Sequence, residues 1–286
     1  MKIEGILKTI WNELIYGGHL LPLGAVSIVY TSAVLLGIKI TWDCLVVVLL
    51  GMEAAYLYNR YKELDIDYLT NLDRVKHLKK NIKYIPFLIF FYIFLTIFFL
   101  IYFNKLSVAI FGFIIFVISL LYTVFFKNWT KKIIGFKDIF IGLIWASLVF
   151  FLSFYYSYPF LIPQILIFIF ICLRCFMGTS LYDIKDIESD KKEKLLTPAI
   201  VFGEKKLMYF LKIINVLSLT PIVIGVFWGI FPKFSLMLLF LIIFSFYFFE
   251  KAEKEKINIA YLSEIAIGVE KLSWSLLILI GIFLSC

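Results

Sequence analysis

The sequence predicts an all-α integral membrane protein that forms a bundle of nine transmembrane helices. Of its 286 residues, 63% are hydrophobic and 17% are charged, whereas soluble domains average about 45–50% apolar and about 25% charged residues. The apolar residues also gather in runs close to the ~20 residues that a helix needs to cross the hydrocarbon core. These two observations exclude an ordinary soluble domain.

Nine apolar runs follow one another without a linker or a low-complexity segment, so we expect one transmembrane domain over residues 1–286. Residues 1–16 precede them and alternate charged with apolar side chains, a pattern typical of an amphipathic helix lying at the membrane surface. The runs cover residues 17–38, 41–58, 85–103, 106–126, 139–156, 162–182, 207–230, 234–249 and 265–286.

The distribution of positive charge predicts the orientation of the chain. Lysine and arginine gather before the first run and in the loops after the second, fourth, sixth and eighth runs. By the positive-inside rule, these segments and the N-terminus lie in the cytoplasm, and the C-terminus lies outside. A net charge of +8 on one face favours anionic ligands or lipid headgroups, although orientation alone would also explain it. Nucleic acid is not an expected partner, because the basic loops are short and tethered to the bilayer.

Two acidic motifs stand in these basic loops, one after the second run and one after the sixth. Each places three oxygen-bearing side chains on one face of a helix, because residues three or four positions apart are neighbours there. Such side chains would repel one another unless a cation lay among them, and Mg²⁺ typically bridges one or two carboxylates to substrate phosphates. The expected ligands are Asn59, Glu63 and Asp67 in the first motif and Asp183, Asp186 and Asp190 in the second.

The two motifs also resemble copies of each other, since one constant offset aligns Lys62 with Lys185 and Asp67 with Asp190. We therefore expect two pseudo-repeated four-helix units plus a ninth helix. The motifs would face each other across a central cavity open to the cytoplasmic side, each holding one Mg²⁺ ion on a shared diphosphate. Solvated acidic helix ends are the alternative interpretation of either motif.

Basic residues near the motifs are the expected ligands of that diphosphate. Arg74 is the first candidate because a planar guanidinium suits bidentate phosphate recognition, and Arg60 lies at the edge of the metal-facing arc. The other candidates are Tyr122, Lys127, Lys131, Lys132, Lys137, Lys191 and Lys192. Each lysine would serve equally well as an interfacial anchor.

Charged residues inside the apolar runs are costly, at about 2.5–3.5 kcal/mol each at a helix centre, and usually face a cavity or a partner. Glu53 and Arg174 lie at similar depths below the two motifs. We expect them to form an ion pair that fixes the second helix against the sixth. Lys212, Glu264, Glu270 and Lys271 are expected to pair or to reach the surface near helix ends.

The two motifs resemble the paired aspartate-rich motifs of the UbiA-type membrane prenyltransferases, whose usual forms are Asn-Asp-x-x-Asp-x-x-x-Asp and Asp-x-x-Asp-x-x-x-Asp. The number of runs, Tyr122 and Lys127 before the fifth helix, and Thr197-Pro198 after the second motif also fit that family. The first motif departs from the pattern, because Arg60 stands where aspartate is common and Glu63 replaces an aspartate.

The resemblance implies an enzyme of lipid or quinone biosynthesis. It would bind a prenyl diphosphate through two Mg²⁺ ions and ionise it to an allylic cation in an apolar tunnel. It would then transfer the isoprenoid chain to a small aromatic or lipid acceptor. By this resemblance Asp67, Asp183, Asp186 and Asp190 are the expected catalytic residues.

Two other functions remain open from the sequence. In one, a phosphoribosyl diphosphate is the donor and a prenyl phosphate is the acceptor, and the motifs do not separate this case from the first. The other is a membrane transporter. Transporters typically hold their ions near the bilayer midplane, whereas both acidic motifs here are expected at the cytoplasmic surface.

Overall fold

A computed structural model of the chain describes residues 2–62, 64, 68, 71–103, 105–121, 125–254 and 259–285. Every regular element in these ranges is helical. The elements are α1 (Lys2–Asn12), η1 (Glu13–Gly17), α2 (Leu20–Leu35), α3 (Trp42–Lys62), α5 (Leu72–Lys79), η2 (Ile82–Tyr84), α6 (Ile85–Tyr102), α7 (Leu106–Leu121), α8 (Lys127–Thr130), α9 (Phe136–Ala146), α10 (Leu148–Tyr156), α11 (Ile162–Tyr182), α12 (Ile187–Lys192), α13 (Pro198–Leu217), α14 (Thr220–Phe227), η4 (Lys233–Leu239), α15 (Phe240–Lys254) and α16 (Ile259–Ser285).

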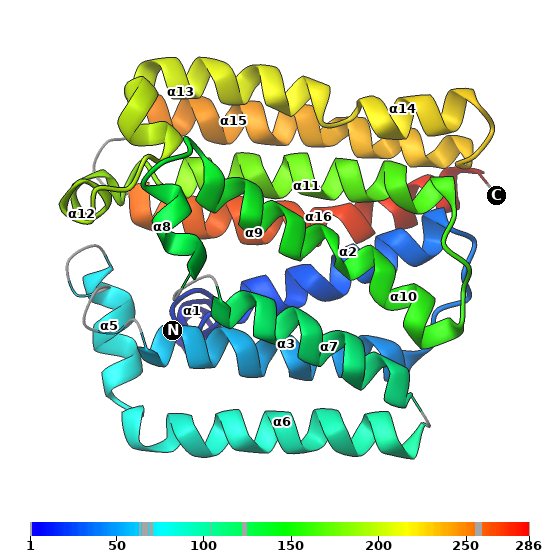
Figure 1. Ribbon diagram of the computed structural model, residues 1–286, viewed down its shortest axis with the longest axis horizontal. Coiled ribbons are helices and arrows are strands. Elements are labelled where there is room, and N and C mark those ends of the chain that lie inside the picture. Colours follow the sequence, from blue (N-terminus) through cyan, green and yellow to red (C-terminus); the bar gives the residue numbers. More distant parts are fainter. Residues whose placement is uncertain are drawn as a thin grey trace.

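The long helices lie side by side along one direction, and helices occupy part of each of the nine expected runs (Figure 1). Within the described part of the chain, six spans are long and apolar enough to cross a membrane by length and composition. They are Ile82–Tyr102, Phe136–Tyr156, Ile162–Tyr182, Pro198–Phe227, Lys233–Lys254 and Leu262–Ser285. The bent pair Gly5–Gly17 and Leu20–Leu35 makes a seventh if it is counted as one span. The prediction of an all-helical, multi-pass membrane protein is therefore confirmed, while the count of nine crossings stays a prediction.

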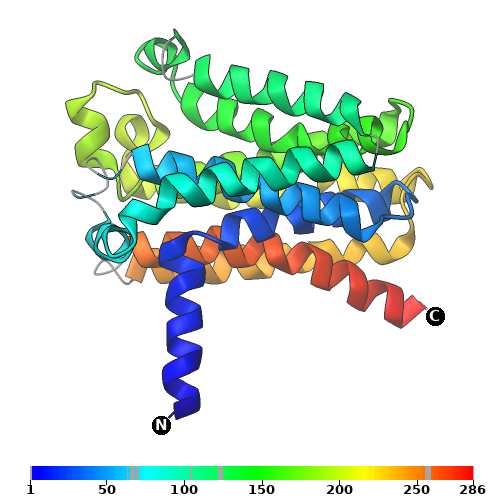
Figure 2. The same ribbon diagram turned by 90° about the horizontal axis from the view of Figure 1, so that it is seen from below.

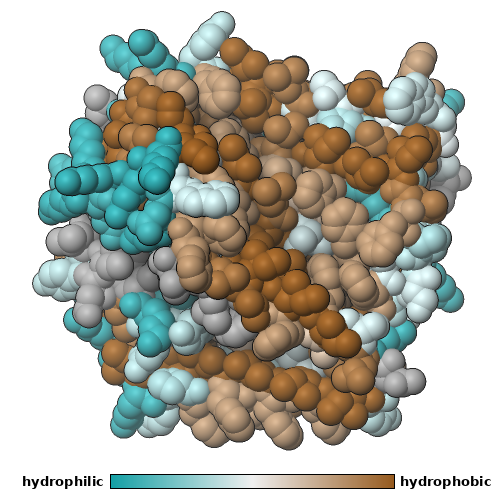
Figure 3. Space-filling view, in the orientation of Figure 1, coloured by the Kyte–Doolittle hydropathy of each residue, from teal (hydrophilic) through white to brown (hydrophobic). Residues whose placement is uncertain are grey.

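The surface divides into an apolar middle and a polar end. In Figure 3, hydrophobic side chains cover the middle of the bundle, and hydrophilic ones gather at the left end, where Figure 1 shows α5, α8 and α12. Helix α1 leaves the bundle at a sharp angle (Figure 2), since the segment Gly5–Gly17 is bent by 79° from Leu20–Leu35. It exposes Ile6, Leu7 and Ile10, as a helix at a membrane surface would.

Small residues let two helix pairs that carry the site approach closely. A Cβ atom added at Gly142 of α9 would lie 2.9 Å from the backbone oxygen of Cys172 in α11. One added at Gly24 of α2 would lie 2.9 Å from Cβ of Lys271 in α16. Such close approach is the usual basis of helix association in lipid, where burial of apolar surface supplies little driving force. These contacts fix α9 against α11 and α2 against α16.

Candidate active site

The second acidic motif forms a buried cluster directly after α11. The apolar helix ends at Tyr182, and the next residue, Asp183, is only 2% exposed. Asp190 of the short helix α12 is 6% exposed and lies beside it. Lys137 of α9 joins the two, because its Nζ donates to Oδ1 of Asp183 at 2.7 Å and lies 3.7 Å from Oδ2 of Asp190. Of the expected lysines, Lys137 is therefore the one that contacts the motif.

Two carboxylate oxygens of this cluster lack a hydrogen-bond partner. Oδ2 of Asp183 and Oδ2 of Asp190 are buried and accept no hydrogen bond from any described residue, although Lys137 lies within ion-pair distance of the second. Burial raises the pKa of Asp190, the positive charge of Lys137 lowers it, and the negative charges of Asp183 and Asp186 raise it, with a net value of about 6. A second cation among these oxygens would remove that penalty, so their chemistry fits Mg²⁺.

The described residues do not complete a metal site by themselves, because no group of three or more Asp, Glu, His or Cys side chains among them is placed to hold an ion. Glu63 and Asp67, the expected carboxylates of the first motif, lie outside the described residues, as does Tyr122. Asp138, next to Lys137, is fully buried, and neither of its carboxylate oxygens has a hydrogen-bond partner in the described chain. Asp138 was not among the predicted site residues, although an aspartate in the first turn of an apolar helix indicates a possible functional group.

Two arginines, one in the first motif and one in the helix after it, contact one buried glutamate. Asn59 and Arg60 stand in the last turn of α3. Nη1 of Arg74 in α5 donates to Oε1 of Glu264 in α16 at 2.6 Å, and Nη2 of Arg60 lies 3.6 Å from Oε2 of the same residue. Tyr182 also donates its hydroxyl to Glu264. One carboxylate thus holds both predicted diphosphate ligands. Glu264 was expected to pair or to reach the surface near a helix end, but its partners were not predicted.

Gly18 makes room for the Arg60 guanidinium. Its backbone has φ +95°, a conformation that side chains rarely adopt, and a Cβ atom there would overlap Cζ of Arg60. Nη1 of Arg60 also donates to the backbone oxygen of Tyr16 at 3.2 Å. The loop before α2 therefore closes over the arginine.

The segment that follows the first motif contacts the beginning of the second motif. Nη1 of Arg74 donates to the hydroxyl of Tyr182 at 3.4 Å, and Nζ of Lys185 donates to Oδ1 of Asn71 at 3.1 Å. Nζ of Lys185 also lies 3.6 Å from the centre of the Tyr182 ring, a cation–π contact. Residues more than one hundred positions apart thus meet at the same end of the bundle.

The other predicted basic residues lie at the surface of that end. Lys127 forms a half-exposed ion pair with Glu193 at 2.8 Å. Lys131, Lys132, Lys191 and Lys192 are exposed. Among the described residues, none of them forms an ion pair with Asp183 or Asp190; that partner is Lys137.

The predicted ion pair between Glu53 and Arg174 is replaced by two separate contacts. Oε1 of Glu53 lies 2.8 Å from Nδ1 of His19. Nη2 of Arg174 lies 2.7 Å from Oε1 of Glu270, and Nη1 donates to Oδ1 of Asn215 at 2.6 Å. Similar depth in the membrane does not make two side chains face each other, and Arg174 points toward α13, α15 and α16.

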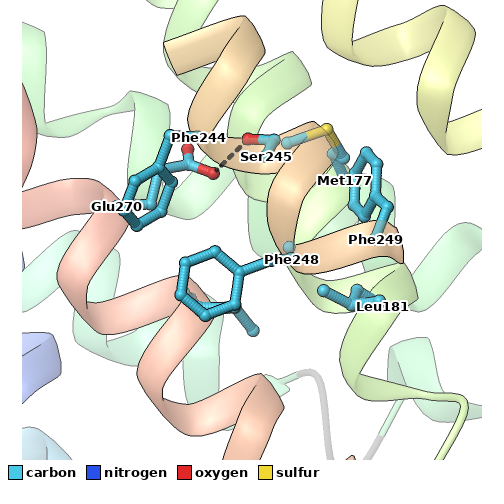
Figure 4. Close-up of a pocket in the computed structure, with 10 residues that line it drawn as sticks. Met177, Leu181, Phe244, Ser245, Phe248, Phe249 and Glu270 are labelled. Atoms are coloured by element: carbon cyan, nitrogen blue, oxygen red, sulfur yellow. Dashed lines mark hydrogen bonds between the residues drawn. The ribbon is translucent and has the colours of Figure 1, made fainter. Parts of the chain in front are cut away.

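A small hollow adjoins this second network (Figure 4). Apolar side chains of α11, α15 and α16 form most of its wall, including Met177, Leu181 and Phe248. Ser245 donates to Oε2 of Glu270 at 3.0 Å within it. Neither Asp183 nor Asp190 lines the hollow, so it belongs to the Arg174 network.

Comparison with known proteins gives a family match over most of the chain. The model of the UbiA prenyltransferase family matches residues 20–277. No curated protein matches significantly.

Three solved structures are similar in fold. One is an apo UbiA homolog from Aeropyrum pernix K1, with a TM-score of 0.65, 16% identity and coverage of 92% of this chain and 97% of that chain. Another is described as a digeranylgeranylglyceryl phosphate synthase, with a TM-score of 0.56, 20% identity and coverage of 96% and 98%. A third is a UbiA homolog from Archaeoglobus fulgidus bound to DMAPP and Mg²⁺, with a TM-score of 0.50, 15% identity and coverage of 92% and 86%.

Proposed function

Since the chain belongs to the UbiA prenyltransferase family and is a membrane prenyltransferase, we propose that it transfers a prenyl chain from a prenyl diphosphate to a small aromatic or lipid acceptor. Membership of an enzyme family decides against the transporter. The observation that carries the proposal is the buried cluster of Asp183, Lys137 and Asp190, which lies at the same end of the bundle as Arg60 and Arg74.

The proposed cofactor is Mg²⁺, as two ions bound together with the diphosphate. Bound Mg²⁺ supplies positive charge that stabilises the departing diphosphate. The buried oxygens of Asp183 and Asp190 that accept no hydrogen bond from the described residues support this assignment, and so do the DMAPP and Mg²⁺ bound by the Archaeoglobus fulgidus homolog. The residues that would hold the ions are Asn59, Glu63, Asp67, Asp183, Asp186 and Asp190.

The basic side chains bind and orient the donor. Arg60 and Arg74 present planar guanidinium groups that suit diphosphate oxygens, and Glu264 and Tyr182 hold those groups in place. Nζ of Lys137 lies between the second-motif carboxylates and is positioned to donate to a diphosphate oxygen. Tyr122, Lys127 and Lys191 are the remaining proposed diphosphate ligands.

In the proposed transfer, the bond between C1 of the prenyl chain and the diphosphate oxygen breaks, and the diphosphate leaves with the electron pair. The acceptor then supplies the electron pair for its new bond to C1 and loses one proton. The apolar interior excludes water, which would otherwise capture the allylic cation.

We also propose that the N-terminus and this end of the bundle face the cytoplasm, with the C-terminus outside. The exposed lysines around α8 and α12 support that orientation. The site would then open to the compartment that holds soluble diphosphates.

A product analysis tests the function. The purified protein in proteoliposomes is incubated with Mg²⁺, geranylgeranyl diphosphate and either 4-hydroxybenzoate or an alkylglyceryl phosphate. Products are identified by mass spectrometry. We expect an acceptor bearing the prenyl chain, formed by the wild type and by Glu188→Gln, whose exposed carboxylate lies on α12, but not by Asp183→Asn. If the protein forms a product only when it is given phosphoribosyl diphosphate and a prenyl phosphate, the prenyl compound is the acceptor and the sugar diphosphate is the donor. No product in either arm would contradict the proposal.

A further inference from the structure

Lys271 is a charged residue in the interior of the bundle. It stands in the middle of α16 and is only 6% exposed. Its stem packs against Gly24 of α2, and its Nζ lies 3.6 Å from the centre of the Trp145 ring of α9. A lysine at membrane depth usually marks a binding or transport function, because its burial is costly.

No described carboxylate neutralises this ammonium. Glu270 lies within electrostatic range of Lys271, but its carboxylate is already paired with Arg174 at 2.7 Å. Those two charges cancel, and Nζ of Lys271 forms neither an ion pair nor a hydrogen bond with the described chain. The face of Trp145 attracts a desolvated cation, but less strongly than burial disfavours an unpaired charge. The ammonium form of Lys271 therefore needs a counter-ion, which an anionic ligand would supply.

Lys271 lies next to the proposed donor site. It stands two helical turns after Glu264, on the same face of α16 and about 10 Å along the axis at 1.5 Å per residue. Tyr56 of α3 lies near both Trp145 and the proposed donor site. Its ring lies 6.0 Å from that of Trp145, and it is within electrostatic range of Arg60 and Glu264.

We propose that Lys271, whose ammonium lies over the Trp145 ring, binds an anionic group of the acceptor, either a carboxylate or a phosphate. The inference rests on the proposed prenyl transfer and names the acceptor's chemical class. An ammonium would oppose an allylic cation at the same position, so this level of the bundle suits the acceptor and not the reacting end of the donor. The donor's diphosphate would lie one level above, at Arg60 and Arg74.

The test compares anionic with neutral probes by thermal unfolding in detergent. Without Mg²⁺ or donor, we expect 4-hydroxybenzoate or an alkylglyceryl phosphate to stabilise the wild type. The neutral 4-hydroxybenzyl alcohol should not. Stabilisation by the carboxylate alone identifies an aromatic acid, and stabilisation by the phosphate alone identifies a lipid phosphate. If the wild type does not prefer an anion, the inference is wrong, whatever any variant does.

Lys271→Met keeps the length of the side chain and removes its charge. We expect it to weaken binding of the anionic probe at least tenfold, to unfold at the same or a higher temperature than the wild type, and to keep Mg²⁺-dependent stabilisation by geranylgeranyl diphosphate. Lys212→Met, which breaks a half-exposed pair with Glu253, should leave the probe's affinity unchanged. Unchanged anion affinity in Lys271→Met would overturn the inference. If geranylgeranyl diphosphate with Mg²⁺ does not stabilise the wild type, the proposed function is overturned instead.

Discussion

Replacing Glu264 with glutamine tests whether one carboxylate holds both arginines of the donor site. The side chains of Arg60, Arg74 and Glu264 are 5%, 11% and 10% exposed, so solvent screens their charges weakly. Removing one partner of a buried ion pair costs about 3–5 kcal/mol, because the other charge stays buried. Glutamine keeps a hydrogen-bonding oxygen for Arg74 and Tyr182, so we expect the lower end, about 3 kcal/mol.

Thermal unfolding in detergent measures this loss. For chains of about 150–250 residues, 1 kcal/mol shifts the Tm by about 2–4 °C, so Glu264→Gln should unfold about 6–12 °C below the wild type. The matched control is Glu253→Gln, which removes a surface pair with Lys212 worth at most about 1 kcal/mol. A prenyl diphosphate supplies negative charge to the same guanidinium groups, so it should stabilise Glu264→Gln more than the wild type. A Tm loss no larger than that of the control would refute the reasoning.

Three further predictions follow from buried groups. Because the folded pKa of Asp190 is raised to about 6 from 3.8, its contribution to stability is present below about pH 4 and is lost as pH rises through about 6. Without Mg²⁺ the free energy of unfolding should fall by about 2–3 kcal/mol over that interval, and Asp190→Asn should flatten the profile measured in EDTA. Arg174→Met should cost about 3–5 kcal/mol, and adding Glu270→Met should restore most of it; simple additivity in the double-mutant cycle would disprove the pairing. Gly18→Ala should weaken donor affinity, measured by titration with geranylgeranyl diphosphate, because its Cβ displaces the guanidinium beneath it; Gly37→Ala, at φ +68° with open space around it, should not, and equal effects would contradict this assignment.

The sequence predicted helices in each of the apolar runs, because apolar runs of membrane-spanning length have few alternatives in lipid. It also predicted an acidic motif at the end of the sixth run. The sixth run ends at Tyr182, and the structure buries Asp183 and Asp190 directly after it, beside Lys137. A pattern of residue types was sufficient there, because the helix end and the motif are adjacent in the chain.

The partners of buried charges were harder to predict. Hydrophobicity fixes that a helix spans the membrane, but not how it rotates about its axis, so Arg174 faces Glu270 and not Glu53. Glu264 contacts Arg74 from a position 190 residues away, and no local pattern encodes a contact of that range. The sequence shows which buried charges need a partner, and only the packing shows which partner each one has.

The most direct test of the account is Mg²⁺-dependent binding of a prenyl diphosphate at the second motif. The Tm of the purified protein is measured with geranylgeranyl diphosphate, with and without Mg²⁺, for the wild type, Asp190→Asn and Glu188→Gln. The account predicts that the donor and Mg²⁺ together raise the Tm of the wild type and of Glu188→Gln, and that Asp190→Asn loses this rise. An equal rise in all three proteins, or a rise that does not need Mg²⁺, would contradict it.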